Sequence, residues 1–187
     1  SAGFMHAGYP IMAHMRSAGR SVDLEQLEKQ GSWGHFHELG HNAQQRAWTF
    51  AGTVEVTCNL FSLHAMEKIV GIAGHGGVAK ARARAAAYLA RGGDFERWKR
   101  EPFLALEMYR QLIEAFGWDS FTRVFREYDA LPKGERPRSD REKRDQWCLR
   151  FSKQVGRDLS PFFARWAVPL SPSVQEELAE LEDWSGK

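Results

Sequence analysis

Apolar side chains recur every three or four residues along most of the chain, which predicts a mainly helical protein. In residues 102–116, for example, Phe103, Leu106 and Tyr109 lie on one helical face. Gly117 follows as a stop signal, because glycine readily takes the left-handed conformation that ends a helix. Other helices are predicted at residues 21–29, 33–46, 54–70, 78–91, 118–128 and 140–155, and at the segments that start near Ser160 and Ser173.

A strand is predicted near the start of the chain, at residues 8–12. Pro10 removes one main-chain donor and is tolerated where that donor would face outward, so this is expected to be an edge strand. An edge strand beside a catalytic metal can pair with the main chain of an extended substrate, which makes Gly8, Tyr9 and Pro10 candidate substrate-binding residues. A purely structural strand is the alternative, and if the run were helical the protein would be all-α.

The chain opens within this run, without a start methionine, a signal sequence or a polar lead-in. We therefore expect a fragment of a longer protein, with further strands of the sheet upstream. The predicted fold class is mainly α with a short β element at the N-terminus. Three parts are expected: an edge strand and short helix in residues 1–30, the metal-binding helices in 31–75 and a helical C-terminal lobe in 76–187.

The composition is that of an ordinary globular protein. Of the 187 residues, 43% are hydrophobic and 27% are charged. A net charge of +2, with arginines scattered through the predicted helices, argues against a nucleic-acid partner. The longest stretch of low polarity, residues 78–90, contains Lys80, Arg82 and Arg84 and is not a transmembrane segment. Cys58 and Cys148 are expected to be buried free thiols.

Two histidines and two glutamates carry the strongest chemical signal. His37 and His41 are four residues apart, so on a helix they share one face and can bind one metal ion. Catalytic zinc takes three protein ligands and keeps a water position open, which makes Glu55, 14 residues after His41, the candidate third ligand. Glu38 is placed to accept a proton from the activated water. The pattern predicts a zinc-dependent peptidase, and a solvated helix with two chance histidines is the alternative.

Two further residues fit this interpretation. Gly40 would ordinarily weaken a helix by about 1 kcal/mol, so its presence between the ligands predicts that another backbone passes close by. Asn59 is four residues after Glu55 and could orient a ligating histidine. The alternative for Asn59 is an ordinary amide on the helix surface.

Four runs of residues, with one tryptophan, carry a resemblance to a known family: residues 33–42, 55–61, 8–11 and 159–163, with Trp166. They resemble the enhancin-like zinc metallopeptidases. These enzymes are gluzincins, in which the third zinc ligand is a glutamate on the helix that follows, and the spacing from His41 to Glu55 falls within their pattern.

The resemblance implies that residues 1–187 are a single fragment of a catalytic domain with an α+β zincin-like fold and a bound Zn²⁺. It implies an endopeptidase acting on a protein or glycoprotein substrate, in particular O-glycosylated, mucin-like proteins, and a secreted or cell-surface location. It also implies a donor for the oxyanion of the tetrahedral intermediate, for which Tyr109 is the first candidate. An ordinary core aromatic is the alternative for Tyr109. The oligomeric state stays open.

Two other functions remain open. The same family includes vertebrate TRP-channel-associated factors, so the chain could be a non-catalytic regulatory or binding module. A structural zinc site with a fourth protein ligand and no open cleft is the other. His64 and His75 could be further metal or transition-state groups, or ordinary surface histidines.

Overall fold

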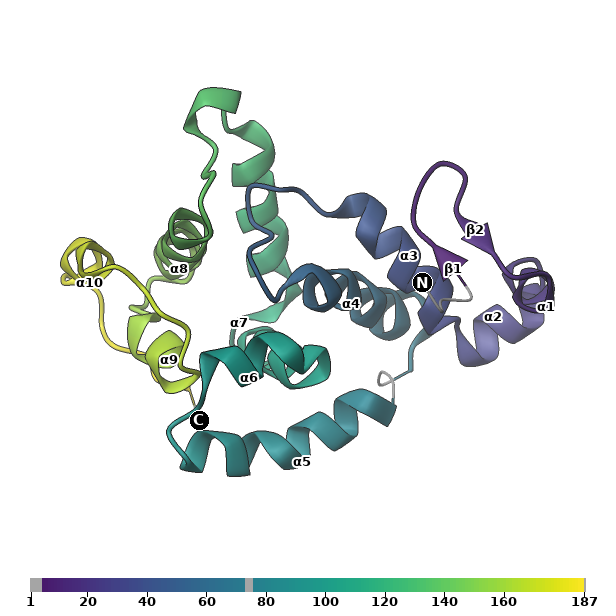
Figure 1. Cartoon of the computed structure of the whole chain (residues 1–187), viewed down its shortest axis with the longest axis horizontal. Coiled ribbons are helices and arrows are strands. Elements are labelled where there is room, and N and C mark those ends of the chain that lie inside the picture. Colours follow the sequence, from purple (N-terminus) through teal and green to yellow (C-terminus); the bar gives the residue numbers. More distant parts are fainter. Residues whose placement is uncertain (1–4, 73–75, 187) are drawn as a thin grey trace.

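The computed structural model describes residues 5–72 and 76–186, which form a set of packed helices with one short β-hairpin at the N-terminal end (Figure 1). The predicted fold class, mainly α with a short N-terminal β element, is confirmed. The elements in chain order are β1 (Met5–His6), β2 (Met12–Ala13), α1 (Met15–Ala18), η1 (Gly19–Ser21), α2 (Leu24–Gln30), α3 (Trp33–Ala43), α4 (Val54–Ala65), η2 (Met66–Val70), α5 (Gly76–Ala90), α6 (Phe95–Arg100), α7 (Pro102–Ala130), η3 (Lys133–Glu135), α8 (Asp140–Val155), α9 (Ser160–Arg165) and α10 (Pro172–Leu178).

The N-terminal β element differs from the prediction. Strands β1 and β2 pair antiparallel, with Met5 opposite Ala13, and most of the predicted strand at 8–12 lies in the loop that connects them. Two residues explain the difference. Gly8 has a φ of +139°, which side chains rarely allow, and Pro10 cannot donate to a ladder. Only Met12 of the predicted strand is in β2.

Several helix boundaries also differ from the prediction, because other residues cap the helices. Helix α2 is capped by the side chain of Asp23, which accepts a hydrogen bond from the main chain of Gln26, and Ser21 lies in the preceding 3₁₀ turn η1. Helix α3 ends at Ala43, three residues early. Helices α9 and α10 begin at Ser160 and Pro172, after Leu159 and Ser171.

The short helices α1 and α6 were not predicted, and the remaining helices follow the sequence pattern closely. Helix α8 begins where it was predicted, with a capping box in which Ser139 and Glu142 bond reciprocally to each other's main chain. Helix α7 has a kink at Gly117, whose φ of 75° interrupts it at the predicted stop. The predicted helix after Thr53 continues to Val70, with a π-helical last segment, η2.

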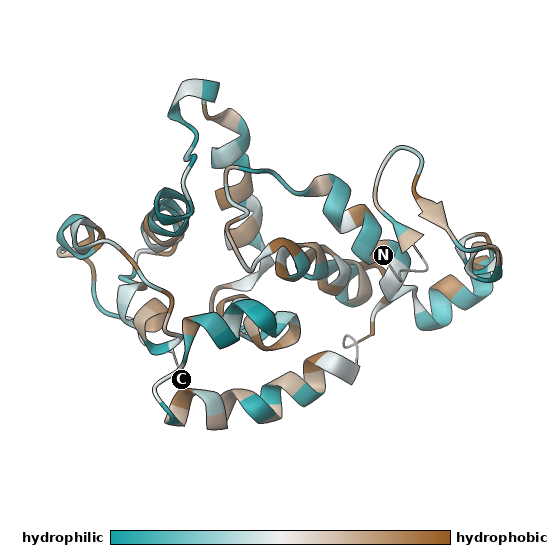
Figure 2. Ribbon diagram, viewed as in Figure 1, coloured by the Kyte–Doolittle hydropathy of each residue, from teal (hydrophilic) through white to brown (hydrophobic). Residues whose placement is uncertain are grey.

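Helix α4 lies in the middle of the molecule, with α3 along one side of it and α7 packed against it (Figure 1). The hydropathy colouring shows apolar residues concentrated on α4 and on the inner parts of the helices around it (Figure 2). Both cysteines are buried and free, as predicted. Within the two described ranges, no helix combines the length and the apolar character that a membrane span requires.

Candidate metal centre

Helices α3 and α4 approach each other closely at Gly40. A Cβ atom added to Gly40 would overlap the carbonyl oxygen of Cys58 and lie 2.9 Å from its Cα, so only glycine allows this approach. The predicted close passage of another backbone is therefore present. Its effect is to bring the first turns of α4 against the face of α3 that carries His37 and His41.

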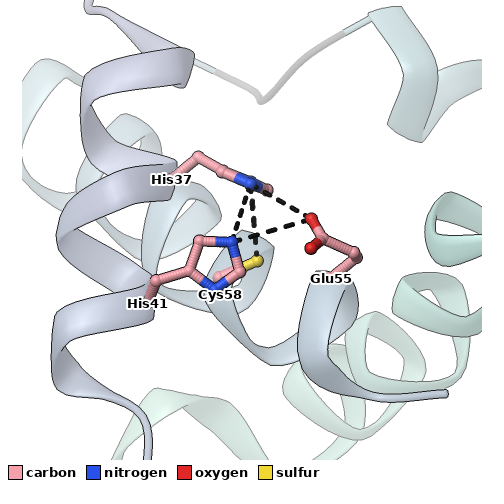
Figure 3. A group of neighbouring side chains, drawn as sticks. All are labelled: His37, His41, Glu55 and Cys58. Atoms are coloured by element: carbon pink, nitrogen blue, oxygen red, sulfur yellow. Dashed lines mark hydrogen bonds and ion pairs between the residues drawn. The ribbon is translucent and has the colours of Figure 1, made fainter. Parts of the chain in front are cut away.

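Three of the predicted ligand side chains converge in the space between these helices (Figure 3). The Nε2 atoms of His37 and His41 are 3.1 Å apart. Glu55 Oε2 lies 3.2 Å from His37 Nε2 and 3.7 Å from His41 Nε2. The histidines are largely buried, and the Glu55 side chain is 55% exposed, so the cluster is open to solvent on the Glu55 side.

These distances fit one shared metal ion. Donors bound tetrahedrally at the usual zinc distances of about 2.0–2.1 Å lie about 3.3 Å from one another. The three separations observed, 3.1, 3.2 and 3.7 Å, bracket that value. Two imidazole nitrogens and one carboxylate oxygen are also the donor set of a catalytic zinc site of the His₂Glu type. In the described part of the chain, these three side chains and Cys58 form the group of metal-ligating side chains that lies close enough together to hold an ion.

Asn59 orients the first histidine. Its Oδ1 lies 2.8 Å from His37 Nδ1 and also accepts a hydrogen bond from Trp33 Nε1, while its Nδ2 donates to the carbonyl of Glu55. An acceptor at Nδ1 places the ring proton there and leaves the lone pair of Nε2 directed at the cluster. Asn59 is 4% exposed, so it is a buried partner of His37 and not the surface amide that was the alternative.

Gln44 orients the second histidine, a role that was not predicted from the sequence. Its Oε1 lies 2.9 Å from His41 Nδ1, and its Nε2 donates to Thr57 Oγ1 and to the carbonyl of Val54. Gln44 was expected to continue the helix. It is instead the C-cap of α3 with an extended backbone (ψ of 144°), and this turn carries its amide back towards His41.

Cys58 is the fourth side chain of the cluster and was also missed. Its Sγ lies 3.4 Å from His37 Nδ1, on the inner side of the site. Burial raises the pKa of the Cys58 thiol far above its ordinary range, and the negative charges of Glu55 and Glu38 raise it further. Without a bound ion the thiol is therefore a neutral neighbour of the ring. The spacing of three residues from Glu55 was the available signal, since residues three apart share a helix face.

Glu38 and the N-terminal hairpin flank the cluster. Glu38 is half-buried on α3, next to His37. Asn42, just beyond the histidines, binds the loop of the hairpin through two hydrogen bonds, from the main-chain N–H of Gly8 and to its carbonyl, both 2.9 Å long. This contact fixes the loop to α3, and Tyr9 beside it is 91% exposed.

Tyr109 is not brought to the cluster. It is 2% exposed in the core, with its ring beside Phe121 and Trp147, and burial raises the pKa of its hydroxyl. The apolar pattern of α7 turns this face inward, so Tyr109 is the core aromatic that was the alternative. His64 lies outside the cluster and packs edge-on against Trp118, and His75 is outside the described residues.

Comparisons with known proteins show the family of the chain. The family described as peptidase M60, enhancin and enhancin-like, matches residues 1–167. A TRPM8 channel-associated factor homolog of Danio rerio is 42% identical over 99% of this chain, which spans about a fifth of the length of that curated relative (20%). A conserved protein of unknown function from Bacillus anthracis has a similar structure, with a TM-score of 0.84 at 29% identity over 98% of this chain and 38% of that one.

The IMPa metallopeptidase from Pseudomonas aeruginosa shares the fold, with a TM-score of 0.71 at 20% identity over 97% of this chain and 25% of its own. Its low identity supports the fold alone. The family match covers most of the chain, and the Danio rerio relative is similar along nearly all of it. The chain therefore belongs to the peptidase M60 family of enhancin and enhancin-like proteins, as the resemblance of its sequence implied.

Proposed function

We propose that this chain carries the catalytic centre of a zinc-dependent endopeptidase. The observation that carries the proposal is the convergence of His37 Nε2, His41 Nε2 and Glu55 Oε2, with separations of 3.1 to 3.7 Å. Membership of a metallopeptidase family supports a hydrolytic role for this donor set. The exposed side of Glu55 leaves room for a water molecule and a substrate, as a catalytic site requires and a closed structural site does not.

Zinc held by these three side chains would supply a Lewis acid that polarises the scissile carbonyl and lowers the pKa of a water molecule. In the proposed mechanism Glu38 is the general base: its carboxylate accepts the proton of the attacking water and delivers it to the leaving amine. Asn59 and Gln44 hold the two imidazoles with Nδ1 protonated, so that neither ring turns its lone pair away. The donor to the oxyanion is a residue other than Tyr109.

O-glycosylated, mucin-like proteins are the substrate class that we propose. The resemblance to the enhancin-like enzymes supports it, as does one structure of the fold relative IMPa, at 19% identity, in complex with an O-glycopeptide. The hairpin loop is the proposed contact for the substrate main chain. It is held on α3 at Gly8, and both Tyr9 and Pro10 are exposed.

The test is a metal analysis coupled to a digest of mucin by the purified chain. We expect about one zinc per chain, loss of the metal in His41→Ala, and retained metal in Glu38→Gln with cleavage reduced about 10²- to 10⁴-fold. His64→Ala is the matched control, because His64 lies outside the cluster, and it should keep both metal and activity. Stoichiometric zinc with no cleavage of any glycoprotein would contradict the enzymatic part of the proposal.

The second candidate function is a non-catalytic binding module. It is favoured by the name of the Danio rerio relative, a TRPM8 channel-associated factor homolog at 42% identity. In that case the fold would serve as a docking surface for a channel of the TRPM8 type. Two results together would support this second function. The chain should bind a purified channel equally well with and without the Glu38→Gln substitution, and it should cleave no glycoprotein.

A further inference from the structure

A cavity of about 330 Å³ lies away from the metal centre, where the loop after α3 meets η3 and the start of α8. Apart from two apolar residues, every side chain that lines it is basic. We call this cavity the basic pocket, and its basic residues are Arg46, Lys133, Arg136, Arg138 and Lys143.

The folded chain creates this concentration of charge. Arg46 comes from a segment almost ninety positions before the other four, and the whole chain has a net charge of only +2. Several basic residues elsewhere on the molecule stand beside acidic ones. Arg97 pairs with Glu101, for example, and Arg110 is bonded twice to Glu107. The basic pocket lacks such partners in its lining.

Two of the five basic side chains are fixed by neutral groups. Arg136 Nε donates to the carbonyl of Leu131, 3.1 Å away. Lys143 Nζ donates to the carbonyl of Thr49, also at 3.1 Å. A carbonyl is neutral, so it positions a cation without supplying a counter-charge.

Three carboxylates near the basic pocket are engaged elsewhere, while a fourth, that of Glu135 in η3, is exposed and is not among the residues that line the cavity. Asp140 Oδ1 accepts from the main chain of Ala51 and is 3.9 Å from Lys143 Nζ, at the limit of an ion pair. Glu142 is bound to main-chain N–H groups in the capping box of α8, and Asp129 accepts from the side-chain amide of Gln45.

The other three basic side chains, those of Arg46, Lys133 and Arg138, are exposed and make no side-chain hydrogen bond or ion pair with any residue in the described ranges. Their donors are therefore available to a ligand. Like charges held close together repel, which a bound anion would relieve.

We propose that the basic pocket binds the phosphate or sulfate group of a small ligand. Guanidinium groups bind tetrahedral oxyanions through paired N–H donors, and ammonium groups add charge without a fixed direction. A concave wall of low dielectric strengthens this attraction relative to an open surface. The volume is within the range of small-molecule sites. This binding is a function separate from the metal centre, since the two share no residue.

The test is calorimetric titration of the full chain with inorganic phosphate, inorganic sulfate and inositol hexakisphosphate, with sodium chloride at equal ionic strength as the blank. We expect saturable binding of about one ligand per chain. The double variant Arg46→Gln with Arg138→Gln should bind at least about tenfold more weakly, because each lost charge-assisted hydrogen bond contributes about that factor. Both residues are exposed, so the variant should fold.

The matched control is the double variant Arg91→Gln with Arg100→Gln, which removes the same charge from exposed positions outside the pocket. It should bind as tightly as the unchanged chain. Saturable binding of the inorganic ions supports a site for the free group, and binding of the inositol phosphate alone supports a group carried on a larger molecule. Absence of saturable binding, or an equal loss in the control variant, would overturn the proposal.

Discussion

At the scale of single residues, two side-chain amides decide how the metal centre is oriented. Asn59 comes from α4 and Gln44 from the turn after α3, yet each places an oxygen 2.8 to 2.9 Å from the Nδ1 of a different histidine. Each amide is itself held by its NH₂ group, through the carbonyl of Glu55 for Asn59 and through Thr57 and Val54 for Gln44. The histidine rings are therefore fixed before any metal binds, which lowers the entropy cost of binding.

This arrangement predicts the behaviour of Asn59→Ala. Loss of the acceptor at His37 Nδ1 frees the tautomer and the rotation of the ring, so metal affinity should fall about 10- to 100-fold. Competition with a chromophoric chelator measures the change. Asn42→Ala is the matched control, because Asn42 binds Gly8 of the hairpin and makes no hydrogen bond to either ring. Equal metal affinity in the two variants would show that Asn59 does not act through His37.

At the scale of elements, the site depends on how closely α3 and α4 pack. The approach is possible because Gly40 has no side chain where the backbone of Cys58 passes. Gly34, six residues earlier on the same helix, faces a different neighbour: a Cβ there would lie 2.7 Å from the terminal methyl of Met5. Backbone cannot move aside without shifting α4, whereas a methionine side chain can take another rotamer.

The two glycines therefore predict opposite results for the same substitution. Gly40→Ala should lower the free energy of unfolding by about 1 to 3 kcal/mol, because overpacking forces the helices apart, and it should also weaken metal binding. Gly34→Ala should be neutral or stabilise the chain by up to about 1 kcal/mol through helix propensity. Urea unfolding followed by circular dichroism measures both. If Gly40→Ala were as stable as Gly34→Ala, the backbone contact would not limit the packing.

At the scale of the whole molecule, features that depend on neighbouring residues were predicted correctly from the sequence. Contacts between residues far apart in the chain were not. The paired histidines, the start of α8 and the interruption at Gly117 are set by residues within one or two turns, and all three were predicted. Glu55 could be predicted because a catalytic zinc site needs a third ligand. Gln44 was not, since its position depends on a helix that ends three residues early.

The other differences have the same origin. Helical periodicity showed that Tyr109 lies on an apolar face, but it could not show whether that face meets the metal or the core. The basic pocket was hidden because Arg46 and Arg138 meet only in the folded chain, while the charge count remains near balance. Contacts between residues far apart in the chain require the tertiary structure, which periodicity does not contain.

Buried ionisable side chains in the core predict how the free energy of unfolding changes at alkaline pH. Cys148 on α8 is fully buried, and this burial raises the pKa of its thiol from 9.0 to about 12. The folded chain keeps this proton at pH values where the unfolded chain has lost it. Stability is therefore intact below about pH 9 and falls above it, by up to about 1.4 kcal/mol per pH unit for one such group. Burial likewise raises the pKa of the Tyr109 and Tyr128 hydroxyls, which add to the loss above about pH 10.

Cys148→Ala tests this account. The variant should be less stable at pH 7 because a buried side chain is shortened. Its free energy of unfolding should decline less steeply between pH 9 and 10, because unfolding of the variant releases about one proton fewer. Urea unfolding at a series of pH values under reducing conditions measures both slopes. Cys58 and the tyrosines are present in both proteins, so the difference between the slopes isolates Cys148. Parallel slopes would mean that Cys148 ionises equally in the folded and unfolded chains, and that its burial in α8 does not hold the proton.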